Sequence, residues 1–220
     1  MNPIKARHAV AATLLALGAA MAQAQGIADP AGDFLSTYTG PRNGDLDVLG
    51  AFAGYNAQTS RFTFSGTFAA AVGTTLGAFY VWGLDRGQGT ERFVAGTPSV
   101  GAGVRFDSVV FLRPDSTARV VRFVGATNTF TELALGTATI VGNTISASID
   151  GSLLPSTGFA PTGYTWNLWP RTGGTNDTIA DFAPDRSNAP IAPVPEPETY
   201  ALLMGGLAVM GLVSRRRKKA

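Results

Sequence analysis

The stretch Arg61–Phe68 (RFTFSGTF) alternates strictly between apolar and polar residues. In an extended chain, Phe62, Phe64 and Phe68 fall on one side with Gly66 among them, and the polar side chains fall on the other. A period of two is the pattern of a β-strand that buries one face and exposes the other to water. We therefore predict a half-buried strand, whose phenylalanine face needs a second layer to cover it.

Similar short segments flank this strand, separated by turns rich in Gly, Pro and Asn. Pro114-Asp115-Ser116 is a hairpin signal, and both residues of Gly142-Asn143 tolerate the positive φ of a two-residue hairpin turn. Weaker candidates are an edge strand at Phe34–Tyr38 and a closing strand at Ile179–Phe182. The main predicted strands are Leu46–Ala53, Gly77–Leu84, Val109–Arg113, Thr117–Phe123, Thr137–Val141, Thr144–Ile149 and Tyr164–Trp169.

The pattern as a whole indicates an all-β fold. Outside the two terminal segments, no window of helical length has apolar residues at spacings of three and four. About nine short strands favour an antiparallel β-sandwich, with a closed β-barrel as the alternative. The Thr137–Ile149 hairpin followed by Ser152-Leu153-Leu154-Pro155 resembles the end of DOMON-like and carbohydrate-binding sandwiches, so we expect a jelly-roll or DOMON-like body over residues 25–190.

The predicted body is a single domain that folds without disulfides. It has about 165 residues, which is long enough to bury one core, and the chain contains no cysteine. Between Gln25 and Val194 there are 10 Arg and no Lys against 13 Asp and Glu, a net charge of −3. A basic surface for nucleic acid is therefore not supported, although the whole chain has a net charge of +2.

The first 24 residues have the three parts of a secretory signal peptide. Lys5 and Arg7 precede an apolar run, and Ala22-Gln23-Ala24 matches the small-x-small pattern of a cleavage site. This segment predicts a helix that is handled by the Sec translocon and removed by signal peptidase. The only histidine, His8, would be lost with it.

The C-terminus also has three parts. Residues 191–199 form a proline-rich linker, residues 200–214 an apolar stretch, and residues 215–220 a basic end with Arg215, Arg216, Arg217, Lys218 and Lys219. The apolar stretch can satisfy its backbone in lipid only as a helix, and it is short for a full span. The basic end would stay in the cytoplasm, which places the body outside.

This order resembles the PEP-CTERM sorting signal of Gram-negative bacteria that produce exopolysaccharide. The resemblance rests on the box Val194-Pro195-Glu196-Pro197, the glycine-interrupted apolar stretch and the terminal arginines. It implies that a membrane-embedded exosortase cuts near the box after transient inner-membrane anchoring, and delivers the body to the cell surface or extracellular matrix. A permanent single-span anchor with a proline-rich stalk is the alternative.

The mature body lacks the residues of most catalytic sites. Without His, Cys or Lys, it has no Ser-His-Asp or Cys-His machinery, no histidine-ligated metal and no lysine Schiff base. Carboxylates could still act on a glycosidic bond, but they lie mostly in turns, where turn formation explains them. We therefore predict that the body is not an enzyme and needs no cofactor, with calcium as the one candidate ion.

The candidate calcium ligands fall into two groups. Asp45 and Asp47 are two residues apart and would share a face of an extended chain, and Asp177, Asp181 and Asp185 cluster in a Gly- and Asn-rich loop. Loop carboxylates are the hard oxygen ligands that calcium takes. Neither group follows the EF-hand spacing, and the alternative is that they cap turns.

Aromatic residues give a second candidate site. Alternation places Tyr80 with Trp82, and Tyr164 with Trp166, while Trp169 falls on the opposite face. Such rings stack on sugars when they line an exposed sheet face. The alternative, that they form a wall of the core, is the more frequent arrangement for tryptophan in a sandwich.

These observations lead to one function and two alternatives. The chain is predicted to be an exported, exosortase-processed structural or binding module of the exopolysaccharide layer. The first alternative is a carbohydrate-binding or calcium-dependent adhesive domain. The second is a glycoside-active enzyme with two facing carboxylates.

Overall fold

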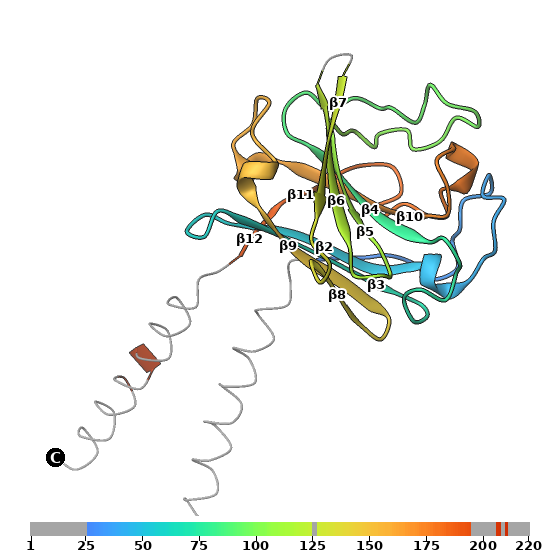
Figure 1. Ribbon diagram of the computed structural model, residues 1–220, viewed down its shortest axis with the longest axis horizontal. Coiled ribbons are helices and arrows are strands. Elements are labelled where there is room, and N and C mark those ends of the chain that lie inside the picture. The colour runs from blue at the N-terminus through green and yellow to red at the C-terminus, as the bar shows by residue number, and fades with distance from the viewer. Residues whose placement is uncertain (1–25, 125–126, 195–205, 208–209, 211–220) are drawn as a thin grey trace, which may run out of the picture.

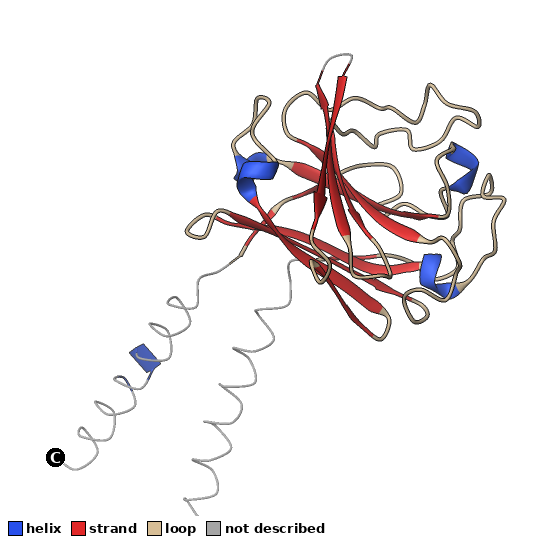
Figure 2. Ribbon diagram, viewed as in Figure 1, coloured by secondary structure: helices blue, strands red, loops and turns tan. Residues whose placement is uncertain are grey.

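The computed structural model describes residues 26–124, 127–194, 206, 207 and 210. Two β-sheets are packed face to face, with loops and four short 3-10 turns around them (Figures 1 and 2). The two sheets are separate, so the predicted all-β sandwich is confirmed and the alternative of a closed barrel is wrong.

The first sheet has the strand order β1-β2-β3-β9-β8, with β12 also paired to β2. All pairs are antiparallel except β12 with β2, which is parallel. The predicted strand Arg61–Phe68 is β3 and lies at the centre, between β2 and β9. The bounds are β1 Ile27–Ala28, β2 Val48–Asn56, β3 Arg61–Phe68, β8 Ala138–Val141, β9 Thr144–Asp150 and β12 Ala192–Pro193.

The second sheet has the order β11-β10-β4-β5-β6-β7, and all its pairs are antiparallel. Strands β4 to β7 form a meander, and β10 returns beside β4 after the chain has passed through the first sheet. The bounds are β4 Phe79–Asp85, β5 Ser108–Leu112, β6 Ala118–Val124, β7 Thr127–Leu133, β10 Thr165–Arg171 and β11 Ala189–Pro190.

Both predicted hairpins form. Residues 114–116 connect β5 to β6, and Gly142-Asn143 connects β8 to β9. Gly142 has φ +59° and Asn143 does not have a positive φ, which is the φ pattern of a type II′ turn. The turn residues therefore set the register of β8 on β9, which pairs Val141 with Thr144.

Two predicted strands are wrong. Phe34–Tyr38 is a loop, in which the adjacent residues Phe34 and Leu35 both pack against a small cluster beside the sandwich instead of pointing to opposite faces. Ile179–Phe182 makes only isolated bridges from Ile179 and Ala183 to β10. The sequence reading also missed β7 and the two-residue strands β1, β11 and β12, which are too polar or too short to give a periodic signal.

The core lies between the sheets. The phenylalanine face of β3 meets the inward face of β4, where Phe64 and Trp82 have ring centroids 6.0 Å apart and Phe68 and Tyr80 4.5 Å apart. A Cβ added at Gly66 would lie 3.2 Å from Cζ2 of Trp82, so glycine makes room for the indole. The alternation of β3 thus determines which of its side chains meet the opposite sheet.

Strands β4, β5 and β10 of the second sheet are covered on both faces. Its outer face carries another apolar cluster, in which Val81, Val109, Val121 and Trp169 pack against loop residues from 93–106 and 179–182. Consequently β4 and β10 are buried at nearly every position, whereas β3 alternates. A sheet covered on both sides reads as a continuous apolar run.

The folded body extends beyond the predicted boundary at residue 190. Ile191 is buried in the core, and the backbone N–H of Val194 donates to the carbonyl oxygen of Tyr55 at 3.1 Å. The first four residues of the predicted linker 191–199 therefore belong to the sandwich. β12 fixes them as a strand at the edge of β2.

The predicted terminal segments lie mostly outside the described residues. The signal peptide 1–24 and the basic end 215–220 are not described, and of the apolar stretch 200–214 only Gly206, Leu207 and Met210 are, all helical. Within the part of the chain that the structure describes, no helix is both long and apolar enough to cross a bilayer.

We expect Phe64→Ala to lower the free energy of unfolding by about 3–5 kcal/mol, because it leaves a cavity between the sheets. Ser65→Ala, on the wet face of the same strand, should change it by less than about 0.5 kcal/mol. Urea denaturation of the two variants measures both values. Similar losses in the two variants would contradict the assignment of the faces.

Candidate functional site

Three carboxylates gather at one end of the sandwich, and we call Asp29, Asp33 and Asp181 the acidic cluster. One oxygen from each lies within 4.8 Å of the others. Asp29 follows β1, Asp33 comes directly after the turn at Ala31 and Gly32, and Asp181 comes from the segment that bridges to β10. The N-terminal loop and a segment near the end of the body thus meet at one point.

Backbone hydrogen bonds hold the cluster together. The N–H of Asp29 donates to the carbonyl oxygen of Leu49 at 3.1 Å, which continues the pairing of β1 with β2. The N–H of Leu35 donates to the carbonyl oxygen of Ala180 at 2.8 Å and joins the N-terminal loop to the segment that carries Asp181. The loop therefore cannot leave the cluster without breaking hydrogen bonds to β2 and to the segment that carries Asp181.

The three carboxylates differ in their hydrogen bonds. Asp181 is 1% exposed, and it accepts from the N–H groups of Val48 at 3.0 Å and Phe182 at 2.7 Å. By contrast, Oδ2 of Asp29 and Oδ1 of Asp33 are buried and have no hydrogen-bond partner in the described chain. A buried acceptor without a donor is costly, so these two oxygens are suited to an electropositive partner.

Burial and mutual repulsion raise the pKa values of the cluster. Burial, followed by the charges of Asp181 and Asp33, raises the pKa of Asp29 to about 8. Burial and the charge of Asp33 raise the pKa of Asp181 to about 7, against the lowering effect of its backbone donors. The pKa of Asp33 is raised mainly by burial. In the described chain, none of the three lies within 4 Å of a cationic side chain.

The geometry suits a hard divalent cation. Calcium takes oxygen ligands from carboxylates, carbonyls and water, and it would replace the missing positive charge. Asp29, Asp33 and Asp181 would hold it. The same cluster can instead hold protons, since two of its members have pKa values near neutrality.

The predicted calcium ligands are only partly brought together. Asp181 belongs to the cluster, and the charges of Asp47 and Asp185 act on Asp29 from nearby. Asp45 and Asp47 do not share a face, because residues 44–46 form a 3-10 turn, in which positions two apart point in different directions.

Asp45, Asp47 and Asp177 accept hydrogen bonds from nearby loop residues. Asp45 accepts from the N–H and Oγ1 of Thr75 at 2.8 and 2.6 Å, and Asp47 accepts from the N–H of Gly32 at 3.0 Å. Asp177 accepts from Oγ1 of Thr39 at 3.3 Å and lies outside the cluster. Asp45 and Asp177 are therefore loop-fixing residues.

Sequence reasoning missed Asp29 and Asp33. Both lie in the N-terminal loop, which has no periodicity and is rich in turn-forming residues. The pair flanks Gly32, whose φ is +82°, so two carboxylates on either side of a tight turn were the available signal. The nearness of Asp181 had no signal in the local sequence.

The candidate sugar-stacking residues are core residues. Tyr80, Trp82, Tyr164 and Trp166 are at most 1% exposed and lie between the sheets. Trp166 donates its indole N–H to the carbonyl oxygen of Pro190 at 3.0 Å. The sugar-stacking hypothesis is therefore wrong for these four residues, because the side of the sheet that they share faces the other sheet. Trp169 lies on the outer face, as the alternation predicts.

The predicted sorting and processing residues lie almost entirely outside the described residues. These are Ala22, Ala24, Pro195, Glu196, Pro197 and the cations 215–219. Val194 is the exception, and it is the last residue that pairs with the sandwich. The box therefore begins at a residue that still belongs to the folded body.

Comparison with known proteins identifies the C-terminal segment. A family model for the PEP-CTERM protein-sorting motif matches residues 193–218. No curated protein and no solved structure matches the chain significantly. The motif implies an exported protein that is processed by an exosortase. The finer resemblance of the body to jelly-roll or DOMON-like folds stays a prediction.

The acidic cluster predicts an unusual pH dependence of stability in metal-free buffer. Because Asp29 and Asp181 have pKa values raised from 3.8 to about 8 and about 7, the folded state holds protons that the unfolded state releases. Their stabilising contribution is complete below about pH 4 and is lost as the pH rises through about 7 and 8. Carboxylates with lowered pKa values, such as Asp115, act in the opposite direction. The stability that they contribute rises with pH and is fully present above about pH 5, so it does not change between pH 5 and pH 8.

The urea midpoint of the mature protein should therefore fall between pH 5 and pH 8 in the presence of a chelator. Asp29→Asn should make this fall smaller, because the amide does not titrate. Asp115→Asn, a surface control, should leave it unchanged. An equal fall in all three proteins would show that the cluster does not cause it.

Proposed function

We propose that this chain is an exported protein of the cell surface or extracellular matrix, whose sandwich is a structural or binding module without catalytic activity. The observation that carries the proposal is the PEP-CTERM sorting motif at residues 193–218. The module is associated with exopolysaccharide and reaches its place after transient anchoring in the inner membrane. Its partners on the way are the Sec translocon, signal peptidase and an exosortase.

The junction between body and motif supports temporary anchoring. Val194, the first residue of the box, is held by β2, and the apolar stretch begins at about Tyr200. This short connection would keep the folded body close to the outer face of the membrane while the basic end stays in the cytoplasm. Cleavage near the box would then release the sandwich with its last strand in place.

The composition of the body supports a role without catalysis. Residues 25–194 contain no His, Cys or Lys, and the carboxylates that gather do so in one cluster with raised pKa values. A glycoside-active enzyme, the less favoured alternative, would need two facing carboxylates in a cleft, one ionised and one protonated. Assay of the mature protein on the exopolysaccharide of its host tests this directly, and release of reducing ends would contradict the proposal.

Replacing Pro195, Glu196 and Pro197 together with alanine should abolish processing. We expect the variant to be retained in the inner membrane with its basic end attached, and the wild type to be recovered outside without it. Cell fractionation, with mass spectrometry of the C-terminus, measures both.

Glu198→Ala is the matched control, since it removes a neighbouring carboxylate and leaves the box intact. It should be processed like the wild type. Recovery of the wild type only as an intact inner-membrane protein, with its arginines still attached, would contradict the proposed destination.

A second proposal concerns calcium. The buried oxygens of Asp29 and Asp33 without hydrogen-bond partners favour a module that binds a divalent cation at the acidic cluster. Such an ion would tie the N-terminal loop to the segment of Asp181 and make the stability of the module, and any adhesion through it, dependent on calcium.

Calcium at a hundredfold excess over its Kd should raise the melting temperature of the mature protein by about 5–10 °C at neutral pH. Asp33→Asn should remove most of this rise, since Asp33 Oδ1 accepts no hydrogen bond in the described chain whose loss would unfold the loop. Asp115→Asn should keep it. Thermal melts with calcium and with chelator provide the measurement, and an unchanged wild-type melt would exclude the site.

A further inference from the structure

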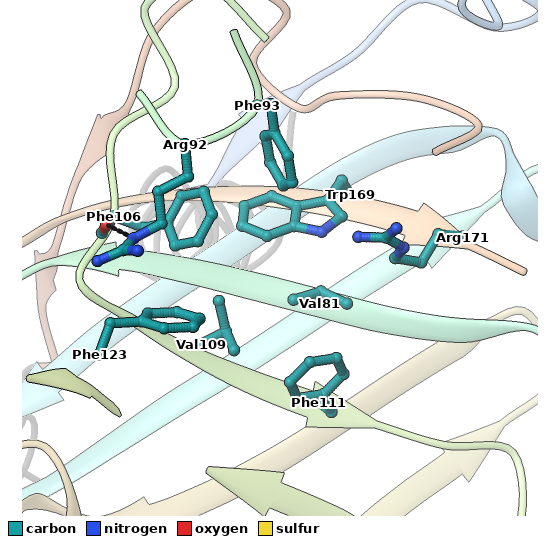
Figure 3. Close-up of a pocket in the computed structure, with 9 residues that line it drawn as sticks. All are labelled: Val81, Arg92, Phe93, Phe106, Val109, Phe111, Phe123, Trp169 and Arg171. Carbon is teal, nitrogen blue, oxygen red and sulfur yellow. Dashed lines mark hydrogen bonds between the residues drawn. The ribbon is translucent and has the colours of Figure 1, made fainter. Parts of the chain in front are cut away.

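A pocket of about 240 Å³ lies on the outer face of the second sheet and shares no residue with the acidic cluster, and we call it the outer-face pocket. Strands β4, β5, β6 and β10 form its floor, and the loop after β4 contributes one wall (Figure 3). Trp169 and Val81 are 1% exposed, whereas Phe111 and Phe123 are partly exposed and Arg92 is exposed at the rim. The pocket therefore has a dry floor and an accessible edge.

Aromatic rings make up most of the wall. Phe93 and Phe106 each have their ring centroids 5.0 Å from that of Trp169, Phe93 edge-on and Phe106 tilted. Trp169 lies over Gly83 of β4, where an added Cβ would be 2.2 Å from Cη2 of the indole. The indole is thus fixed between a strand without a side chain and two phenylalanines. Such a wall accepts one flat or ring-shaped apolar group.

Two guanidinium groups border this apolar space. Arg92 donates through Nε to the carbonyl oxygen of Phe106 at 3.2 Å, and its guanidinium lies 4.2 Å from the ring centroid of Phe123. Arg171 donates to the carbonyl oxygens of Gly173 and Thr175. Within the described chain, neither guanidinium lies within 4 Å of a carboxylate.

Two further observations indicate that the pocket lacks an acceptor. The indole N–H of Trp169 is buried and has no hydrogen-bond partner in the described chain. Burial also lowers the pKa of Arg171 to about 10 and lowers that of Arg92, because the charged forms are poorly solvated. A carboxylate at the rim would accept a charge-assisted hydrogen bond from Arg92 and restore part of the solvation that this charge has lost.

We propose that the outer-face pocket binds a small organic monocarboxylate whose body is a single apolar ring. The ring would lie among Phe106, Phe111 and Trp169, and the carboxylate would accept from Arg92 at the rim. The volume is below the range of about 300–1,000 Å³ for sites that take drug-sized ligands, so one ring is the appropriate size.

A sugar acid fits the same charges less well. Its ring carries several hydroxyl groups, each of which needs a hydrogen-bond partner when it leaves water. The side chains that line the pocket are seven apolar or aromatic groups and two arginines, which offer few partners and no carboxylate or amide acceptor. The lining therefore favours an apolar ring over a hydroxylated one.

Titration of the mature protein with benzoate, followed by NMR of the tryptophan indole N–H signals, tests the proposal. The signal of Trp169, assigned by its absence in Trp169→Phe, should shift with saturation. The signals of Trp82 and Trp166 should not, because both indoles lie on the core side of the sheet. Benzyl alcohol, which has the ring without the charge, and acetate, which has the charge without the ring, should each bind at least tenfold more weakly.

Arg92→Gln should weaken benzoate about tenfold or more through loss of the charge-assisted hydrogen bond. Arg92 is exposed, so this variant is expected to fold. Arg61→Gln, on the other sheet, should bind like the wild type. No shift of the Trp169 signal at millimolar benzoate, or tighter binding of glucuronate than of benzoate, would overturn the proposal. The proposed binding of a monocarboxylate goes beyond the proposed function and does not depend on export. Its failure would therefore leave the processing experiment unaffected.

Discussion

The positions of two tryptophan rings on opposite faces of one sheet depend on glycine. Trp82 points into the core, where Gly66 of the facing sheet leaves room for it, and Trp169 points outward over Gly83. A Cβ at Gly83 would collide with the indole of Trp169, and a Cβ at Gly66 would crowd the indole of Trp82. Gly66 thus allows close packing around the first ring, and Gly83 allows the second ring to lie against its own sheet, where it lines the outer-face pocket.

A buried ion pair holds the loop that completes that pocket. Nε of Arg86 lies 2.8 Å from Oδ1 of Asp107, and its Nη1 donates to the carbonyl oxygen of Pro155 at 2.8 Å. Both side chains are almost fully buried, so removing either would leave an uncompensated charge. The acidic cluster is the opposite case, since it gathers carboxylates without a cation in the described chain. The Arg86–Asp107 pair stabilises the fold, whereas the acidic cluster can bind protons or a divalent ion.

The functional features therefore lie in separate parts of the chain. The C-terminal motif implies export and processing by an exosortase, and it begins where the last described strand ends. The body contributes two possible binding regions, one acidic at an end of the sandwich and one aromatic on an outer face. Because neither region uses the residues of the sorting motif, release from the membrane and ligand binding can be tested independently.

The sequence by itself determined the all-β class, the central strand Arg61–Phe68, both hairpins and the sorting motif, because alternation, turn chemistry and a linear signal are local properties. Tertiary structure alone decided which face of each strand is covered. It buried Tyr80 and Trp166 between the sheets and covered the outer face around Trp169 with loops. It also brought Asp29 and Asp33 to Asp181 through backbone pairing between distant segments. Periodicity shows that a strand has two faces, but only the packing of a second layer decides which of them water reaches.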